Sequence, residues 1–257
     1  MKQFFKIALI ALALMVSVAP LSDAKIKRTK NKSAASTRIA NVNELMRATS
    51  VTPNRDGFIN RDNAPQRSAN IKAVPFITAD GNNVITKIYI KGKLTQNIND
   101  YFNFTYEGFD VYYLDFNYDD YTDICVISKI FPYGGATWLL WNPNLKKFEL
   151  SNVSAQYFSL HPRSKTINFY YSSSMLLGED LFQKCIYRNN KIETIEELVR
   201  YGYNEPSRPY FLRDPNSAEL DDFDNSTGLS EQDIPKEWFI IMDSFGDIVT
   251  SRQQEHH

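Results

Sequence analysis

The chain has 257 residues, with 29 Lys and Arg against 30 Asp and Glu, and 43% of its residues are hydrophobic. The near-zero net charge excludes a nucleic-acid binder that works by bulk positive charge, because phosphate neutralisation needs an excess of Lys and Arg. The apolar fraction excludes a disordered chain, and the length is sufficient for a core of one or two domains. Apart from the last two residues, the only histidine is His161, so a multi-histidine zinc site is effectively excluded.

The first 24 residues have the three parts of a secretory signal peptide. Lys2 and Lys6 form the positive region, residues 7–18 form the apolar region, and Ser22-Asp23-Ala24 is a site for cleavage after Ala24. The apolar region is shorter than the roughly 20 residues that a transmembrane helix needs. We therefore expect a periplasmic or secreted protein with no transmembrane segment once the signal is removed.

A basic tail and a polar segment are expected next. Residues 25–39 carry six basic residues and no acidic one, which predicts a flexible basic tail. The rest of the stretch 25–75 predicts a polar loop with a short helix at about residues 43–48. The signal peptide has a net charge of +1 and the tail +6, so residues 40–257 have a net charge of −8. The β domain, expected at 76–250, is therefore acidic, and complementary charge favours a basic partner.

Short β-branched and aromatic runs separated by turn residues recur from residue 84 onward, which predicts a mainly β domain. Consecutive hairpins with short turns indicate an antiparallel meander rather than a βαβ fold. The proline-rich and acidic stretch 202–236 predicts a long surface loop. The alternative for residues 195–200 is a short helix. The expected strands are 84–90, 110–114, 124–131, 137–141, 148–150, 157–160, 166–171, 181–187, 192–199 and 237–242.

The two cysteines would meet an oxidising compartment after export, which favours a disulfide between Cys125 and Cys185. Such a bond would close a loop of 60 residues and stabilise the fold by about 4 kcal/mol. The alternative is two separate buried thiols.

The strongest local signal lies between two expected strands, at residues 115–123. Side-chain oxygens fall at positions 1, 3, 5 and 9 of this stretch, and three of those side chains are carboxylates that repel one another unless a cation lies among them. A backbone carbonyl at position 7 completes a set of hard ligands that suits Ca²⁺. The alternative is a polar turn that binds no metal. The proposed ligands are Asp115, Asn117, Asp119, the carbonyl of Tyr121, and Asp123.

This loop differs from an EF-hand, since Asp120 stands at the usual glycine position, Val126 replaces the closing glutamate, and a strand follows instead of a helix. Its spacing, with the closing aspartate leading directly into an apolar strand, resembles the calcium loop of FG-GAP (integrin-type) β-propeller blades. The order of strands and aromatic segments over residues 84–200 resembles exported bacterial β-propeller-like proteins, a family that includes immunity proteins inhibiting lysozyme-type toxins. This resemblance implies a non-catalytic protein whose loops cover the active site of a cell-wall hydrolase.

Two rival functions start from other residues. A secreted carbohydrate-active hydrolase could use His161 as a base or a pair of carboxylates as acid and base. A carbohydrate-binding protein could use aromatic side chains such as Tyr112, Trp138 and Trp141 as a platform, although alternating aromatics in strands are more often core. No nucleophile elbow and no glycine-rich phosphate loop is present in the sequence.

Overall fold

The protein is described by a computed structural model that covers eight stretches of the chain. All of them belong to one compact unit, residues 39–257. The predicted signal peptide and nearly all of the predicted basic tail lie in the other unit, outside the described residues. The described residues are 42–79, 81, 83–100, 108–129, 135–173, 179–200, 210–215 and 228–245.

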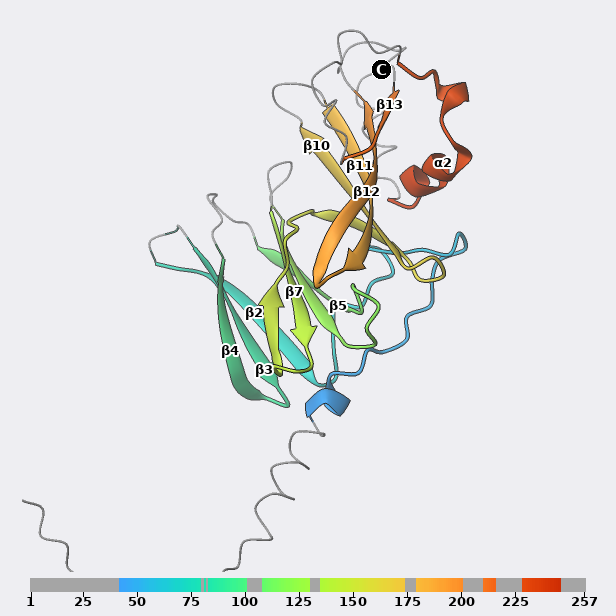
Figure 1. Cartoon of the computed structure of the whole chain (residues 1–257). Coiled ribbons are helices and arrows are strands. Elements are labelled where there is room, and N and C mark those ends of the chain that lie inside the picture. The colour runs from blue at the N-terminus through green and yellow to red at the C-terminus, as the bar shows by residue number, and fades with distance from the viewer. Residues whose placement is uncertain are drawn as a thin grey trace, which may run out of the picture. The chain divides into compact units, whose positions relative to one another are not determined.

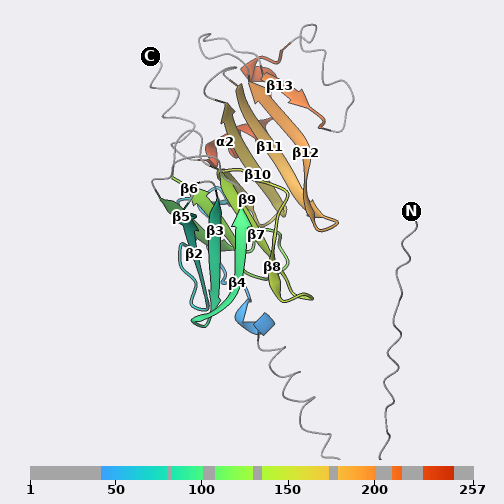
Figure 2. The same cartoon turned by 90° about the vertical axis from the view of Figure 1, so that its left-hand side faces the viewer.

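Three antiparallel sheets form the fold, so the expected mainly β class is confirmed (Figures 1 and 2). In the three-stranded sheet the order is β2-β3-β4, and in the four-stranded sheet it is β5-β6-β7-β8. The strands of the three-stranded sheet are β2 (Ile71–Ile77), β3 (Val84–Ile90) and β4 (Lys93–Asp100). Those of the four-stranded sheet are β5 (Phe109–Leu114), β6 (Asp123–Ser128), β7 (Ala136–Asn142) and β8 (Lys147–Leu150).

The six-stranded sheet has the order β1-β9-β10-β11-β12-β13, and its pairs are antiparallel. A short 3₁₀ helix, η1 (Glu231–Asp233), precedes helix α2 (Lys236–Asp243). None of the helices among the described residues has the length and apolar character needed to span a lipid bilayer. The strands of this sheet are β1 (Ile59–Asn60), β9 (Tyr157–His161), β10 (Thr166–Ser173), β11 (Glu179–Arg188), β12 (Lys191–Arg200) and β13 (Tyr210–Arg213).

The four-stranded sheet is buried on both faces, which explains the near-continuous apolar runs of β6 and β7. One face, with Cys125 and Trp138, packs against Phe158 and Phe169 of the six-stranded sheet. The other face packs against the three-stranded sheet in a cluster of Met46, Ile71, Ala73, Ile88, Ile98, Tyr113, Ile124, Val126, Leu139, Trp141 and Phe148. Successive side chains along each strand point to opposite faces of the sheet, so the four-stranded sheet contributes to two hydrophobic cores.

Most predicted strands are confirmed, but the expected strand at 237–242 is wrong because this segment is helix α2. A continuous apolar run does not distinguish a strand from a buried helix. The buried residues Trp238, Ile241 and Met242 recur at the i, i+3, i+4 spacing of a helix. Pro235 stands at the helix N-cap. The alternative helix at 195–200 is also wrong, since that segment is part of β12.

The expected boundaries of the β domain need correction. Met46 and Phe58 are buried and β2 begins at Ile71, so folded structure starts well before residue 76. The short helix expected at about residues 43–48 is present at 42–45. Strand β13 and a bridge between Tyr210 and Leu229 lie within the segment predicted as a surface loop. Residues 202–209 and 216–227 of that loop lie outside the described residues.

Two side-chain amides join the three sheets by imitating strand pairing. Gln96 of β4 donates from Nε2 to the carbonyl of Phe148 at 2.7 Å and accepts from its N–H at 2.9 Å. Asn152 does the same for Ile192 of β12, at 2.8 and 3.0 Å. Each amide therefore satisfies one backbone N–H and one C=O at a place where neighbouring sheets meet.

Gln96→Ala is expected to lower the free energy of unfolding by about 1–3 kcal/mol, because the N–H and C=O of a buried residue lose their partners. Phe148 is only 2% exposed, so water does not readily replace the amide. Urea unfolding followed by circular dichroism measures the change. The matched control is Asn97→Ala at the exposed neighbour on the same strand, for which a change below about 0.5 kcal/mol is expected. Equal losses in the two variants would contradict the role of Gln96.

Candidate metal centre

The predicted ligand loop connects β5 to β6, directly after the pair formed by Leu114 and Asp123. Two residues adopt the left-handed conformation, Tyr118 with φ of 62° and Asp120 with φ of 69°. Asp120 occupies the position where calcium loops usually have glycine, and aspartate tolerates this region better than most residues. The loop therefore has the sharp turn that the spacing requires without the usual glycine.

Three of the predicted ligand side chains are drawn together. Asp115 Oδ1 and Asn117 Oδ1 both accept the backbone N–H of Asp119, at 3.0 and 3.3 Å. Asn117 Nδ2 donates to Asp119 Oδ2 at 3.1 Å. Asp115 Oδ2 also accepts the N–H of Asp120 at 2.9 Å, and Asp119 Oδ1 accepts the N–H of Tyr121 at 2.9 Å. The oxygens at positions 1, 3 and 5 thus lie on one side of the loop.

Asp123, the last of the predicted ligands, also joins the loop to the sheet. Its side chain is 0% exposed. Oδ2 accepts the N–H of Phe116 at 3.0 Å and Oδ1 accepts the N–H of Trp141 at 2.7 Å. Both carboxylate oxygens therefore hold backbone groups, one at the start of the loop and one on β7. Asp123 is a positioning residue for the loop.

Tyr121 connects the loop to the segment that precedes β1. Ala48 donates its N–H to the carbonyl of Asp120 at 3.0 Å, and Thr122 donates to the carbonyl of Met46 at 2.7 Å. The guanidinium carbon of Arg47 lies 4.9 Å from the centre of the Tyr121 ring. Tyr121 thus supports one side of the loop through its ring.

The opposite side of the loop rests on the six-stranded sheet. Tyr118 donates its hydroxyl to the carbonyl of Thr166 at 2.7 Å. The Asn117 side chain is close enough to Tyr187 of β11 to lower its pKa, although burial raises that pKa more. These contacts were not predicted from the sequence. Thr166 lies 48 residues after Tyr118 and Tyr187 lies 70 residues after Asn117, so the spacing of residues within the loop does not reveal them.

The pKa values of the three carboxyl groups of the loop are raised above their ordinary values. Burial, the main cause, and the charges of Asp119 and Asp120 raise the pKa of Asp115 to about 6, although two backbone N–H groups lower it. Burial also raises the pKa of Asp119, and it raises the pKa of Asp123 well above its ordinary value. Such crowding of hard oxygen donors suits a divalent cation, which would favour the ionised forms.

A metal site made only of charged or thiol groups is not found among the described residues. No group of three or more His, Cys, Asp or Glu side chains in those stretches is arranged to hold a metal ion. The donors that converge here are two carboxylates and one amide, Asp115, Asp119 and Asn117. An oxygen set of mixed carboxylate and amide groups is the kind that Ca²⁺ takes.

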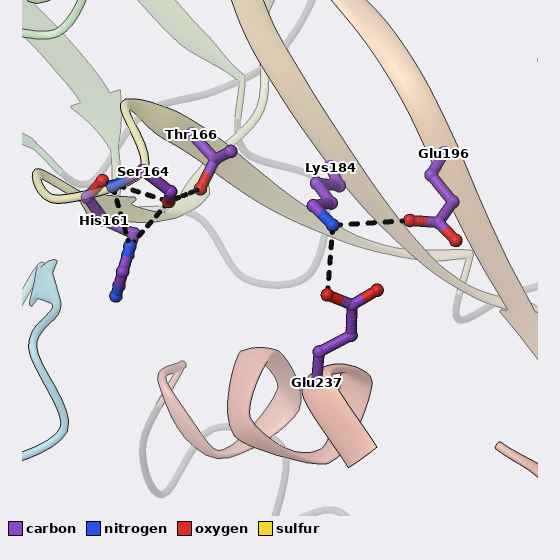
Figure 3. A network of polar contacts seen from close by, with 6 residues as sticks. All are labelled: His161, Ser164, Thr166, Lys184, Glu196 and Glu237. Atoms are coloured by element: carbon purple, nitrogen blue, oxygen red, sulfur yellow. Dashed lines mark hydrogen bonds and ion pairs between the residues drawn. The ribbon is translucent and has the colours of Figure 1, made fainter. Parts of the chain in front are cut away.

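His161, the candidate base of the rival hydrolase function, closes the turn between β9 and β10 (Figure 3). Ser164 donates its N–H to His161 Nδ1 at 3.2 Å, and its Oγ lies 2.6 Å from the same nitrogen. Burial and the charge of Arg163 lower the pKa of His161. Both contacts join residues three apart in one turn, so they account for the histidine as part of the hairpin.

The predicted disulfide is not formed, since Cys125 and Cys185 are both buried free thiols. They belong to different sheets that face each other across one core. Burial raises the pKa of Cys185 to about 12 and that of Cys125 well above its ordinary value. Both residues thus behave as core side chains.

The aromatic platform considered for carbohydrate binding is also corrected. Tyr112, Trp138 and Trp141 are only 2%, 1% and 2% exposed. Trp138 lies between Phe116 and Phe169, with ring centres 4.3 and 5.1 Å away. These side chains fill the two cores and present no surface to a sugar.

No protein-family model matches the chain, and no curated protein matches it. Among solved structures, the chain is similar to one described as "Structure of a Xanthomonas Type IV Secretion System related protein". The identity is 12% and the TM-score 0.38, over 66% of this chain and 99% of that chain. At this TM-score the two chains are not shown to share a fold.

Proposed function

We propose that this chain is an exported, non-catalytic binding protein whose β5–β6 loop holds a Ca²⁺ ion. The observation that carries the proposal is the convergence of Asp115, Asn117 and Asp119 on one side of a loop with raised carboxyl pKa values. The proposed ligands remain Asp115, Asn117, Asp119, the carbonyl of Tyr121, and Asp123, and Asp123 would also position the loop. The ion would supply charge neutralisation and rigidity.

The place of the loop supports the resemblance to FG-GAP blades. Strands β5 to β8 follow one another as a four-stranded antiparallel meander, and the aspartate-rich loop joins its first and second strands. A closing aspartate that leads directly into a buried strand is the pattern on which that resemblance rests. We propose a propeller-like architecture on this basis.

The partner that we propose is a protein, and specifically a basic cell-wall hydrolase that this chain inhibits or confers immunity against. The signal-like first 24 residues support a periplasmic or secreted location, where such an enzyme acts. The net charge of −8 over residues 40–257 supports a basic partner, since complementary charge speeds encounter and favours the correct pair. A rigid calcium loop would supply a fixed edge to the binding surface.

The calcium part of the proposal is tested by thermal unfolding of the mature protein in Ca²⁺ and in chelator. At a Ca²⁺ concentration about 100 times the Kd, the native state gains about 2.7 kcal/mol, which corresponds to a rise in Tm of about 5–10 °C. Asp119→Asn removes one ligand charge but keeps an acceptor for Tyr121, so it should abolish most of the rise. The control Asp120→Asn changes an exposed carboxylate and should keep it. If the Tm of the wild type is the same in Ca²⁺ and in chelator, the loop is a turn that binds no metal and the calcium proposal is wrong.

The partner is tested separately by mixing the mature protein with a panel of muramidases and with any toxin encoded beside it. Inhibition with a stoichiometric complex supports the proposal, and weaker inhibition in chelator would link it to the loop. Absence of both binding and inhibition across the panel would refute the proposed partner. Hydrolysis by the chain itself, lost in His161→Ala, would favour the rival enzyme function.

A further inference from the structure

The six-stranded sheet has two different faces, and α2 covers the outer one. Residues of one parity along β9 to β12 face the four-stranded sheet, among them Phe158, Phe169 and Cys185. The other parity contributes Tyr157, Tyr170 and Phe182 to a cluster with Trp238 and Ile241 of α2. Helix α2 therefore packs on the face that points away from the four-stranded sheet (Figure 1).

A row of polar residues crosses this outer face, next to the aromatic row. The strand register places Asn60 of β1 opposite Ser159 of β9, Ser159 opposite Asn168 of β10, and Asn168 opposite Lys184 of β11. Ser159 and Asn168 are each 0% exposed and Asn60 is 7% exposed. A continuous polar row in this buried position is unusual, because buried polar groups need hydrogen-bond partners.

Helix α2 lies along the polar row and is fastened at both ends of it. At its start, Glu237 accepts from Lys184 Nζ at 3.3 Å, and Glu196 of β12 accepts from the same ammonium at 3.5 Å (Figure 3). After its last turn, the carbonyl of Ser244 accepts from Asn60 Nδ2 at 2.7 Å. Seven helical steps span about 10 Å and three strand spacings about 14 Å. The helix therefore crosses β10 and β9 above Asn168 and Ser159.

Three polar atoms, two on side chains of the polar row and one on helix α2, have no hydrogen-bond partner among the described residues. They are Ser159 Oγ, Asn168 Oδ1 and the indole Nε1 of Trp238. All three belong to side chains that are 0% exposed. Asn168 uses its other end, since Nδ2 donates to the carbonyl of Ser159 at 3.2 Å. The seam, meaning the contact between helix α2 and the polar row, thus contains one unpaired N–H donor, one carbonyl acceptor and one hydroxyl.

We propose that this seam is a binding site for an ordered internal water molecule, held by Trp238, Asn168 and Ser159. Water accepts one hydrogen bond from the indole N–H and donates its two hydrogens to Asn168 Oδ1 and Ser159 Oγ. This leaves each of the three atoms paired. Buried waters typically make about three such bonds, and they are costly to remove. Helix α2 is then joined to the sheet through a wet polar seam along the row and through aromatic packing beside it.

The test is water-to-protein cross-relaxation by NMR on the indole N–H protons of the full mature protein. Trp238 should show a cross-peak to a long-lived water. Trp138 is the matched control, because its equally buried Nε1 donates to the carbonyl of Ala155 at 3.0 Å and should show none. Resonances are assigned with Trp238→Phe and Trp138→Phe, or by sequential assignment if either variant fails to fold. Absence of the Trp238 cross-peak would overturn the proposal.

A second measurement uses Ser159→Ala, a nearly isosteric change. If the hydroxyl holds water, its loss weakens the Trp238 cross-peak and lowers Tm by about 2–4 °C. If the hydroxyl were dry and unpaired, its removal would leave Tm unchanged or raise it, which would refute the water site. The control is Ser164→Ala on the exposed β9–β10 turn of the same sheet, which should leave the Trp238 cross-peak intact.

Discussion

Asp123→Ala is expected to lower the free energy of unfolding by about 4 kcal/mol, even in chelator. The substitution leaves the N–H groups of Phe116 and Trp141 without acceptors in residues that are 0% and 2% exposed. Each buried donor left unpaired costs about 1–3 kcal/mol. Denaturant unfolding followed by circular dichroism, with matched samples in chelator and in Ca²⁺, measures the loss.

Asp123→Asn separates the hydrogen bonds from the charge. Its Oδ1 still accepts one N–H, but Nδ2 is a donor and faces the second N–H, so about half of the loss is expected. Asp119→Asn is the contrasting control, because it should change the response to Ca²⁺ while leaving the stability in chelator nearly unaltered. A stability of Asp123→Ala within about 0.5 kcal/mol of the wild type would refute the positioning role of Asp123.

The strands were predictable where their apolar and polar residues alternate or run continuously between turn residues. Strands β5 to β12 all lie close to the expected ranges, and each pairs with at least one neighbour in sequence. The missed strand β4 has the sequence Lys-Leu-Thr-Gln-Asn-Ile-Asn-Asp and is mostly exposed. A polar strand at the edge of a sheet has too little apolar pattern to be recognised.

Errors arose where tertiary contacts decide between local alternatives. The run 237–242 has an apolar pattern that fits a strand, and only packing on the outer face of the six-stranded sheet gives it the helical solution. Cys125 and Cys185 share a core but are free thiols, and the distance between them depends on the order of all strands that separate them in sequence. The polar loop expected within residues 25–75 includes most of β2, where Pro75 is tolerated because this strand pairs on one side only.

The residues of the candidate site could be predicted from the sequence, but the contacts that hold the loop in place could not. The spacing of oxygen side chains identified Asp115, Asn117 and Asp119, which the turn geometry brings together within nine residues. The role of Asp123 in positioning the loop could not be predicted from the sequence, because Asp123 accepts the backbone N–H of Trp141, 18 residues away. The same holds for Arg47 and Tyr118, whose partners lie in other parts of the chain.

Calcium affinity is expected to fall by about tenfold for each pH unit below 6, because metal ligands must be deprotonated. In the calcium-free protein the pKa of Asp115 is raised to about 6, so binding at lower pH must release a proton from this carboxyl group. Isothermal titration at pH 7 and pH 5, in two buffers of different ionisation enthalpy, measures both the affinity and the protons released. Asp115→Asn should bind more weakly at pH 7 and lose most of this pH dependence.

The carboxyl group of Asp115 also makes stability depend on pH in opposite directions in the calcium-free and the calcium-bound protein. In chelator, a folded-state pKa above the unfolded value of about 3.9 means that Asp115 contributes stability below that value, and the contribution is lost as pH rises through about 6. In Ca²⁺ the ionised form is favoured, so the stability gained from the ion grows over the same range. The difference in Tm between Ca²⁺ and chelator should therefore widen from pH 5 to pH 7. An equal difference at both pH values would mean that Asp115 is not a ligand.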